Sequence, residues 1–257
     1  MHVRPSDLPG DSSYVPPANS NRLLAALPPD ELATLERELQ PVVLEQGVVL
    51  HRPGGSIEHV YFVTTGVVSI VTLMQDGTGV EAAMTGNEGV VGAAVLSGAT
   101  TALSQAVVQI AGTARRMPAP QFVAACRRSA ALQSLVERYQ YALLGHAQQS
   151  AACNALHSVE ARLCRWLLQA RDRTANDMLP LTQEFLAQML GVQRTTVTLV
   201  EGVLQTAGLI KHHRGRIQLL DPERISDAAC ECYATARKNY AVLLPETERP
   251  QQAGSGS

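Results

Sequence analysis

The stretch Leu181–Leu220 reads LTQEFLAQMLGVQRTTVTLVEGVLQTAGLIKHHRGRIQLL and predicts two short helices followed by a β-hairpin. Thr182 is a favourable N-cap for the first helix, and Gly191 suits the tight turn after it. The second helix begins near Gln193, and apolar residues at helical spacing form its buried stripe. These apolar residues are Val197, Val200, Val203 and Leu204. Two apolar segments around the basic turn at residues 211–216 then predict a β-wing.

The second helix carries polar side chains opposite its apolar stripe. Arg194 can bond guanine O6 and N7 together, and Thr195 and Thr198 can contact base edges or a thymine methyl. Hydroxyl, amide and basic groups suited to backbone phosphates flank these base-reading side chains. They belong to Thr182, Gln193, Thr196, Lys211, Arg214 and Arg216. The fixed order of these features predicts a winged helix-turn-helix that binds double-stranded DNA.

Composition and charge agree with a globular DNA-binding protein. The formal net charge is −2, yet residues 158–240 carry 11 Lys and Arg against 9 Asp and Glu. The mild positive balance therefore falls on the segment that would meet phosphates. No apolar run is long enough for a membrane span, and the start lacks a signal-peptide pattern. We therefore expect a cytoplasmic protein that does not bind a membrane.

The five cysteines predict neither a disulfide framework nor a metal site. Their number is odd, and a cytoplasmic setting disfavours disulfides. Cys230 and Cys232 are separated by one residue, which is not the CxxC spacing of many metal sites. We therefore expect structural or incidental roles for all five cysteines, no metal and no cofactor.

The pattern of apolar and turn residues changes along the rest of the chain and predicts an α+β protein. Residues 1–20 have no apolar period and predict a disordered leader, and residues 239–257 predict a flexible tail. From 21 to 125, short Val- and Ile-rich runs alternate with turn residues, which predicts an antiparallel β-roll or jelly roll. Asp76-Gly77 is the clearest hairpin turn in it. Helical patterning over 126–157 and the helix-turn-helix over 158–238 complete the order.

The helical segment 126–157 has a heptad-like apolar seam, which predicts a dimerisation helix in a homodimer. The seam consists of Leu132, Val136, Tyr139, Leu143, His146 and Ser150. A seam on one long helix needs a partner surface. The alternative partner is the helix's own domain.

The segment Leu181–Leu220 resembles the DNA-binding domain of the Crp/Fnr family of bacterial transcription regulators. The order of β-roll, long helix and winged helix-turn-helix extends the resemblance over about residues 21–238. The resemblance implies a homodimer on a near-palindromic site, RNA polymerase as a further partner, and a sensor-like β-roll. The recognition helix departs in part. Where the family pattern reads Arg-Glu-Thr-Val-Gly-Arg, this chain has Arg194 first but Thr195 and Leu199 in place of Glu and the second Arg.

The β-roll departs further from the cyclic-nucleotide binders of that family. They hold the ribose with a Gly-Glu pair and the cyclic phosphate with an Arg followed by Ser or Thr, whereas this chain has Gly92-Ala93 at the first site. No Arg or Lys lies between Pro53 and Ala114, and a buried phosphate without a cation is costly. We therefore expect no control by cyclic AMP in the usual mode. The alternative is an unidentified small molecule in a pocket at Gly92 and Ala93.

Other functional classes fit the sequence less well. No cysteine precedes Cys126, which argues against an iron–sulfur sensor, and only His51 and His59 offer axial haem ligands there. A metal-dependent enzyme on a β-roll requires clustered His and Glu ligands. Glu58 and His59 are adjacent in the sequence, so in a strand they would point to opposite faces. We expect no enzymatic activity. A winged helix that binds proteins would not need the basic wing.

Overall fold

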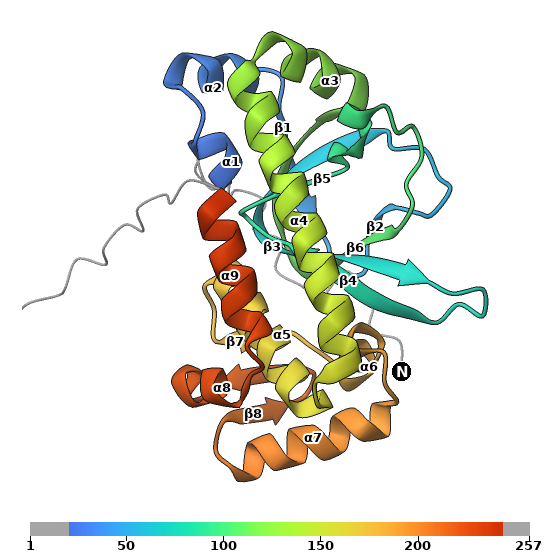
Figure 1. The fold of residues 1–257 in the computed structure, drawn as a ribbon, viewed down its shortest axis with the longest axis vertical. Coiled ribbons are helices and arrows are strands. Elements are labelled where there is room, and N and C mark those ends of the chain that lie inside the picture. The colour runs from blue at the N-terminus through green and yellow to red at the C-terminus, as the bar shows by residue number, and fades with distance from the viewer. Residues whose placement is uncertain (1–20, 244–257) are drawn as a thin grey trace, which may run out of the picture.

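Residues 21–243 are described by the computed structural model, and they have the α+β fold that the sequence predicted (Figure 1). An N-terminal antiparallel sheet is followed by long helices and a C-terminal helix-turn-helix with its own small sheet. The predicted leader 1–20 and the last part of the predicted tail, residues 244–257, lie outside the described residues. No helix within residues 21–243 is long and apolar enough to cross a membrane.

The N-terminal sheet is built around two long, paired strands, β3 and β6. The sheet order is β1-β6-β3-β4, with β2 also on β6 and β5 on β3, and every pairing is antiparallel. The register of β3 against β6 shifts repeatedly between Val63 and Val68, and such bulges bend and twist a strand. The strands are β1 (Gln40–Leu44), β2 (Val49–His51), β3 (His59–Leu73), β4 (Gly79–Thr85), β5 (Val90–Val91) and β6 (Gln105–Pro118).

The predicted hairpin at Asp76-Gly77 is confirmed. It joins β3 to β4, and Gly77 has a φ of +85°, a conformation that glycine adopts without a side-chain clash. The side-chain carboxylate of Asp76 accepts a hydrogen bond from the Thr78 amide at 2.9 Å, which stabilises the turn.

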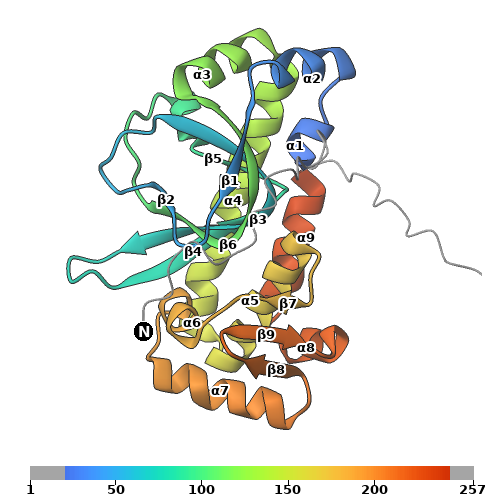
Figure 2. The same cartoon turned by 180° about the vertical axis from the view of Figure 1, so that it is seen from behind.

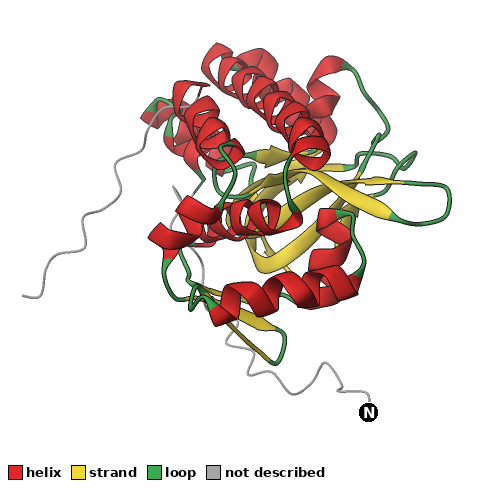
Figure 3. Ribbon diagram, turned by 60° about the horizontal axis from the view of Figure 1, so that its bottom comes forward, coloured by secondary structure: helices red, strands yellow, loops and turns green. Residues whose placement is uncertain are grey.

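Helices cover the sheet on one side and at one end (Figures 1 and 3). The helices of this half are α1 (Arg22–Ala25), α2 (Pro29–Glu36), the 3-10 helix η2 (Ala93–Ser97), α3 (Ala119–Arg128) and α4 (Ala130–Leu156). The long helix therefore begins later than the predicted residue 126. Ser129 is extended and ends α3, and its hydroxyl accepts a hydrogen bond from the Leu132 amide at 2.9 Å to start α4.

The predicted dimer seam on α4 faces its own subunit, which corrects the sequence prediction. Leu132, Val136, Tyr139, His146 and Ser150 are all buried, and Leu143 is half-buried against the same core. The Tyr139 ring occupies the space where a side chain at Gly89 would stand, and its hydroxyl lies 2.8 Å from Thr85 Oγ1. The seam was a correct sign of burial, but the partner surface is the β-domain and the last helix of the same chain.

The C-terminal half is a helix-turn-helix with a wing and two further helices. Its elements are α5 (Val159–Thr174), β7 (Met178–Leu179), α6 (Gln183–Leu190), α7 (Arg194–Thr206), β8 (Ile210–His213), β9 (Arg216–Leu219), α8 (Pro222–Ala228) and α9 (Cys232–Leu243). The predicted tail began at residue 239, but α9 continues to Leu243 and lies beside α4 (Figures 1 and 2). The reason is Tyr240, whose buried ring packs edge-on against His146 of α4.

Two buried polar contacts from α5 join the C-terminal half to the sheet. Trp166 Nε1 donates to the carboxyl of Glu81 on β4 at 2.9 Å, and Ser69 on β3 also donates to that carboxyl. Arg173 forms an ion pair with Glu88 at 2.9 Å, with both side chains nearly buried. Apolar residues of the sheet and of the helix-turn-helix also share one core. The helix-turn-helix is therefore packed onto the sheet and not separated from it by a linker.

The buried Glu81 carboxyl should make the stability of the protein depend on pH. Burial raises its pKa to about 7, against the smaller opposing effects of Ser69, Arg165 and Trp166. The folded protein therefore binds a proton that the unfolded chain releases near its ordinary pKa of 4.5, and stability falls as the pH rises from about 4.5 to about 7. Glu81→Gln cannot ionise. Between about pH 5 and about pH 8 the free energy of unfolding of the variant should gain roughly 2–3 kcal/mol relative to the original protein.

Denaturant titrations at several pH values measure this effect. The matched control is Glu45→Gln, since Glu45 is exposed. If Glu81→Gln and the original protein lose stability in parallel as the pH rises, the carboxyl is not protonated in the folded state.

Candidate DNA-binding site

The two helices of the predicted motif form as the sequence indicated. Thr182 caps α6, because its hydroxyl accepts a hydrogen bond from the Phe185 amide at 3.2 Å. Gly191 ends α6 in the left-handed conformation, with a φ of +62°. Its amide bonds back to the last turn of α6, and the chain then turns into α7 within three residues.

The second helix, α7, presents the predicted base-reading side chains to the outside. Arg194, Thr195 and Thr198 are exposed, whereas Val197 and Leu204 are buried. The Thr198 hydroxyl lies 3.1 Å from both the Arg194 carbonyl oxygen and the Gln183 side-chain oxygen, and its single hydrogen is shared between these two acceptors. No side chain caps α7, because Gln193 makes no capping hydrogen bond. The first amides of the helix therefore have no capping side chain, and an anion can accept from a free amide at such an end.

The wing brings the predicted basic residues to the same end of the molecule. Arg214 and Gly215 both have positive φ, 45° and 75°, as a type I′ hairpin requires. Lys211, Arg214 and Arg216 are exposed. A side-chain carbon at Gly215 would lie 3.6 Å from Thr182 Cγ2, which places the wing tip beside the start of α6. In Figure 1, α7 and the wing strand β8 lie side by side at the lower end of the molecule, and the two elements contact each other.

A buried polar network behind α7 was not foreseen. Glu201 occupies the inward position of the helix, and its carboxylate accepts from Gln183 at 2.6 Å and contacts His212 Nδ1 at 2.9 Å. Val203, predicted in the apolar stripe, is exposed instead. The wing is fixed a second time where the His212 amide donates to the Gln205 side chain at 3.1 Å. A charged residue at helical spacing among apolar ones was the only sequence signal, and it does not reveal a partner on the wing.

The predicted pocket residues Gly92 and Ala93 are closely packed against their neighbours. Gly92 has a φ of +90° and begins η2, and a side-chain carbon there would stand 2.7 Å from His51 Cε1. Ala93 is buried in the main N-terminal core. His51 itself is engaged with the carbonyl oxygen of His59 at 3.0 Å, and burial lowers its pKa, partly offset by that bond.

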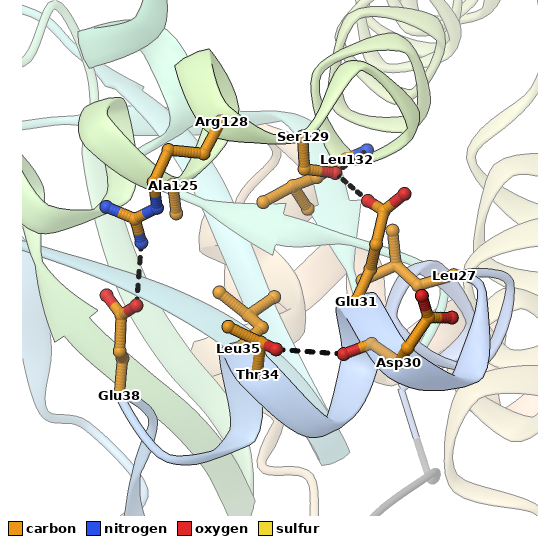
Figure 4. A pocket seen from close by; sticks show the side chains of 10 residues that line it. All are labelled: Leu27, Asp30, Glu31, Thr34, Leu35, Glu38, Ala125, Arg128, Ser129 and Leu132. Atoms are coloured by element: carbon orange, nitrogen blue, oxygen red, sulfur yellow. Dashed lines mark hydrogen bonds and ion pairs between the residues drawn. The ribbon is translucent and has the colours of Figure 1, made fainter.

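A cavity of about 230 Å³ lies elsewhere, between α2 and the junction of α3 with α4 (Figure 4). Its rim carries the carboxylates of Asp30, Glu31 and Glu38, and Arg128 pairs with Glu38 at 2.6 Å. The acidic surroundings would repel a phosphate, so this cavity does not resemble a cyclic-nucleotide site.

Two family profiles match the chain. The Crp-like helix-turn-helix domain covers residues 161–228, and the cyclic nucleotide-binding domain covers residues 41–129. The chain belongs to the Crp/Fnr family of transcription regulators. The second match shows that the β-domain has the fold of a cyclic nucleotide-binding domain. The residues at Gly92 and Ala93 do not supply the groups that hold a cyclic nucleotide in this family.

Solved structures of Crp/Fnr regulators have the same fold. FixK2 from Bradyrhizobium japonicum is 19% identical with a TM-score of 0.64, over 75% of this chain and 98% of its own. A Crp/Fnr-family regulator from Eubacterium rectale is 18% identical with a TM-score of 0.61, over 82% and 98%. A CRP-family regulator from Thermus thermophilus is 22% identical with a TM-score of 0.59, over 74% and 99%. Among curated proteins, none matches this sequence significantly.

Glu201→Ala should loosen the wing from the recognition helix. The substitution leaves the half-buried polar groups of Gln183 and His212 without their partner, and an unsatisfied group that is shielded from water costs up to about 1–3 kcal/mol. We expect a loss of that size in the free energy of unfolding and faster amide hydrogen exchange in β8, measured by mass spectrometry. Glu184→Ala on the exposed side of α6 is the control. Unchanged exchange in β8 would show that the network does not hold the wing.

Proposed function

We propose that this protein is a sequence-specific DNA-binding transcription regulator that acts as a homodimer on a near-palindromic site, without cyclic AMP as its usual effector. The observation that carries the proposal is the joint exposure of Arg194, Thr195 and Thr198 on α7 beside a basic wing. A helix of this kind enters the major groove with its N-terminal turns foremost.

Some of the proposed contacts to DNA read the bases, and the others position the protein on the phosphate backbone. Arg194, Thr195 and Thr198 would contact base edges. The backbone phosphates would be held by the groups around them: Thr182, Gln193, Thr196, Lys211, Arg214 and Arg216. Leu199 is 73% exposed one turn beyond Thr195, where it suits contact with a thymine methyl. The proposed site therefore differs from that of family members that have Arg at this position.

The dimer would form through the outer face of α4, since the seam predicted from the sequence is buried. The residues exposed along this face recur at steps of three and four. They are Ser134, Glu137, Tyr141, Leu144, Gln148, Ala151 and Ala155. Tyr141 and Leu144 are 69% and 53% exposed, and small residues follow them, so a second copy of α4 can approach closely. Such spacing is typical of two-stranded helix packing.

No Arg or Lys lies between Pro53 and Ala114 in the sequence. This supports action without cyclic AMP, because a buried phosphate needs a cation or strong donors. The alternative is a regulator gated by another small molecule in the β-roll. RNA polymerase is the further partner that regulation of transcription by this family implies.

Selection of DNA from a random library, with purified protein and no added ligand, tests the proposal. We expect a two-fold symmetric consensus whose half-sites lie about one helical turn apart. If enrichment occurs only when cyclic AMP is added, the effector-free part of the proposal fails. If no DNA is enriched with any cyclic nucleotide and binding is weak at all salt concentrations, the alternative of an unidentified effector is favoured.

Arg194→Ala should weaken binding to the selected site by about 1–3 kcal/mol and relax the preference at one base position per half-site. Arg216→Ala on the wing should weaken binding to all sequences alike and reduce the slope of log affinity against log salt by about 1. Both effects are read by titration of labelled DNA over a salt series. Lys238→Ala on α9 is the control. An Arg194→Ala variant with unaltered base preference would contradict the assigned role.

Leu144→Asp should convert the dimer to a monomer, because two carboxylates would face each other across the paired helices. Light scattering coupled to gel filtration measures the mass. The control is Leu103→Asp, since Leu103 is 93% exposed in a loop of the β-domain. A variant that remains a dimer would exclude the outer face of α4 as the interface.

A further inference from the structure

Three cysteines and a histidine meet where α4 ends and α9 begins. Cys153 and His157 come from the end of α4, and Cys230 and Cys232 from the start of α9. Their potential ligand atoms all lie within 4.8 Å of one another. The sequence predicted no such site, because the two pairs of residues are far apart in the chain and neither pair has the CxxC spacing.

The distances within this cluster suit a single tetrahedral metal ion. Cys153 Sγ lies 3.5 Å from Cys230 Sγ, and Cys232 Sγ lies 3.6 Å from His157 Nδ1. Zinc bonds of about 2.3 Å to sulfur and about 2.0 Å to nitrogen give tetrahedral edges of about 3.8 Å and about 3.5 Å. The atoms are therefore already near the corners of one coordination sphere. An iron–sulfur cluster needs ligands spread over several irons and fits less well.

The local backbone holds the ligands in place. Cys153 and His157 are four residues apart and so share one face of α4, and the Cys153 carbonyl accepts from the His157 amide at 3.1 Å. At the other side, the Cys230 carbonyl accepts from the Tyr233 amide at 3.0 Å at the start of α9. Cys153, Cys230 and Cys232 are buried.

Neighbouring side chains orient the ligands as they do in metal sites. His157 Nε2 lies 3.1 Å from the Glu231 carboxylate, to which it can donate, and this leaves Nδ1 free to bind through its lone pair. Gln149 donates its amide to Cys232 Sγ at 3.0 Å, a bond that favours the thiolate.

Buried positive charge beside the cluster calls for an anionic partner. Arg162 and Arg165 on α5 are 6% and 5% exposed, each has a buried Nε without a hydrogen-bond partner, and neither takes part in an ion pair within residues 21–243. Their electrostatic fields reach Cys153. The Glu81 carboxyl also lies within range of Arg165, but its pKa is raised to about 7, so it supplies only part of a charge near neutral pH.

We propose that Cys153, His157, Cys230 and Cys232 bind one zinc-class metal ion in a closed structural site. Three thiolates around a divalent ion give a net charge of −1, which offsets the buried guanidinium groups. Binding displaces the thiol protons, so affinity rises with pH. Thiolate ligands favour zinc over magnesium or calcium. The ion would tie the long helix α4 to α9 and hold the C-terminal half against the N-terminal domain.

The experiment uses the full chain without a polyhistidine tag, purified under reducing conditions and loaded with zinc or cobalt alone. We expect one zinc per chain by elemental analysis, and a cobalt spectrum with strong visible bands and thiolate charge transfer, which indicate a tetrahedral sulfur-rich site. His157→Gln and Glu231→Gln alter exposed edges of the site and are expected to fold. Glu231→Gln should weaken metal binding by roughly 10–100-fold, as loss of an orienting carboxylate does elsewhere, and His157→Gln should weaken it further.

Cys126→Ser and Cys164→Ser are the matched controls, because both cysteines are buried but lie outside the cluster. They should retain one zinc with unchanged affinity. A reduced protein that binds no zinc or cobalt stoichiometrically overturns the proposal, as does a cobalt spectrum without thiolate charge transfer. Zinc binding that survives unchanged in His157→Gln and Glu231→Gln also overturns it. Since the readout is metal content, its failure leaves the proposed DNA binding untouched.

Discussion

The buried contacts between α5 and the sheet control how the two halves of this molecule are arranged. Trp166 reaches Glu81, and Arg173 reaches Glu88, each across a 2.9 Å contact in surroundings from which water is excluded. Breaking a buried ion pair by removing one partner is much more costly than losing an exposed one. The position of the helix-turn-helix relative to the sheet is therefore held by specific polar contacts in addition to apolar packing, and α6, α7 and the wing follow from it.

This arrangement leaves two surfaces free for partners. At one end, α7 and the wing present polar and basic side chains and are supported from behind by the Glu201 network. Along the side, the outer face of α4 exposes Tyr141 and Leu144, while its inner face is covered by the β-domain and α9. The proposed function uses the first surface to read DNA and the second for self-association. The packing of α9 against α4 leaves the outer face of the long helix uncovered.

The β-domain lacks the groups that hold a cyclic nucleotide in relatives. The place at which relatives would hold a cyclic nucleotide is closed around Gly92 by His51 and Ile57, and no basic side chain lies in that part of the chain. The fold of the cyclic nucleotide-binding domain has been kept without those groups. The helix α4 packs against this domain and against α9, and the cysteine cluster lies where α4 ends and α9 begins.

The local pattern of residues predicted the helices and the hairpin of the candidate DNA-binding site. The spacing of apolar residues, the cap at Thr182, the glycine at 191 and the basic turn at 214 and 215 are short-range signals, and each formed as predicted. Only the tertiary structure decided what covers the seam face of α4, that Glu201 points inward, and that α9 returns to pack Tyr240 against His146. The same holds for Cys153 and Cys230, which are distant in the chain but 3.5 Å apart. A helical stripe shows that one face will be covered but not by what, because the covering surface comes from residues far along the chain.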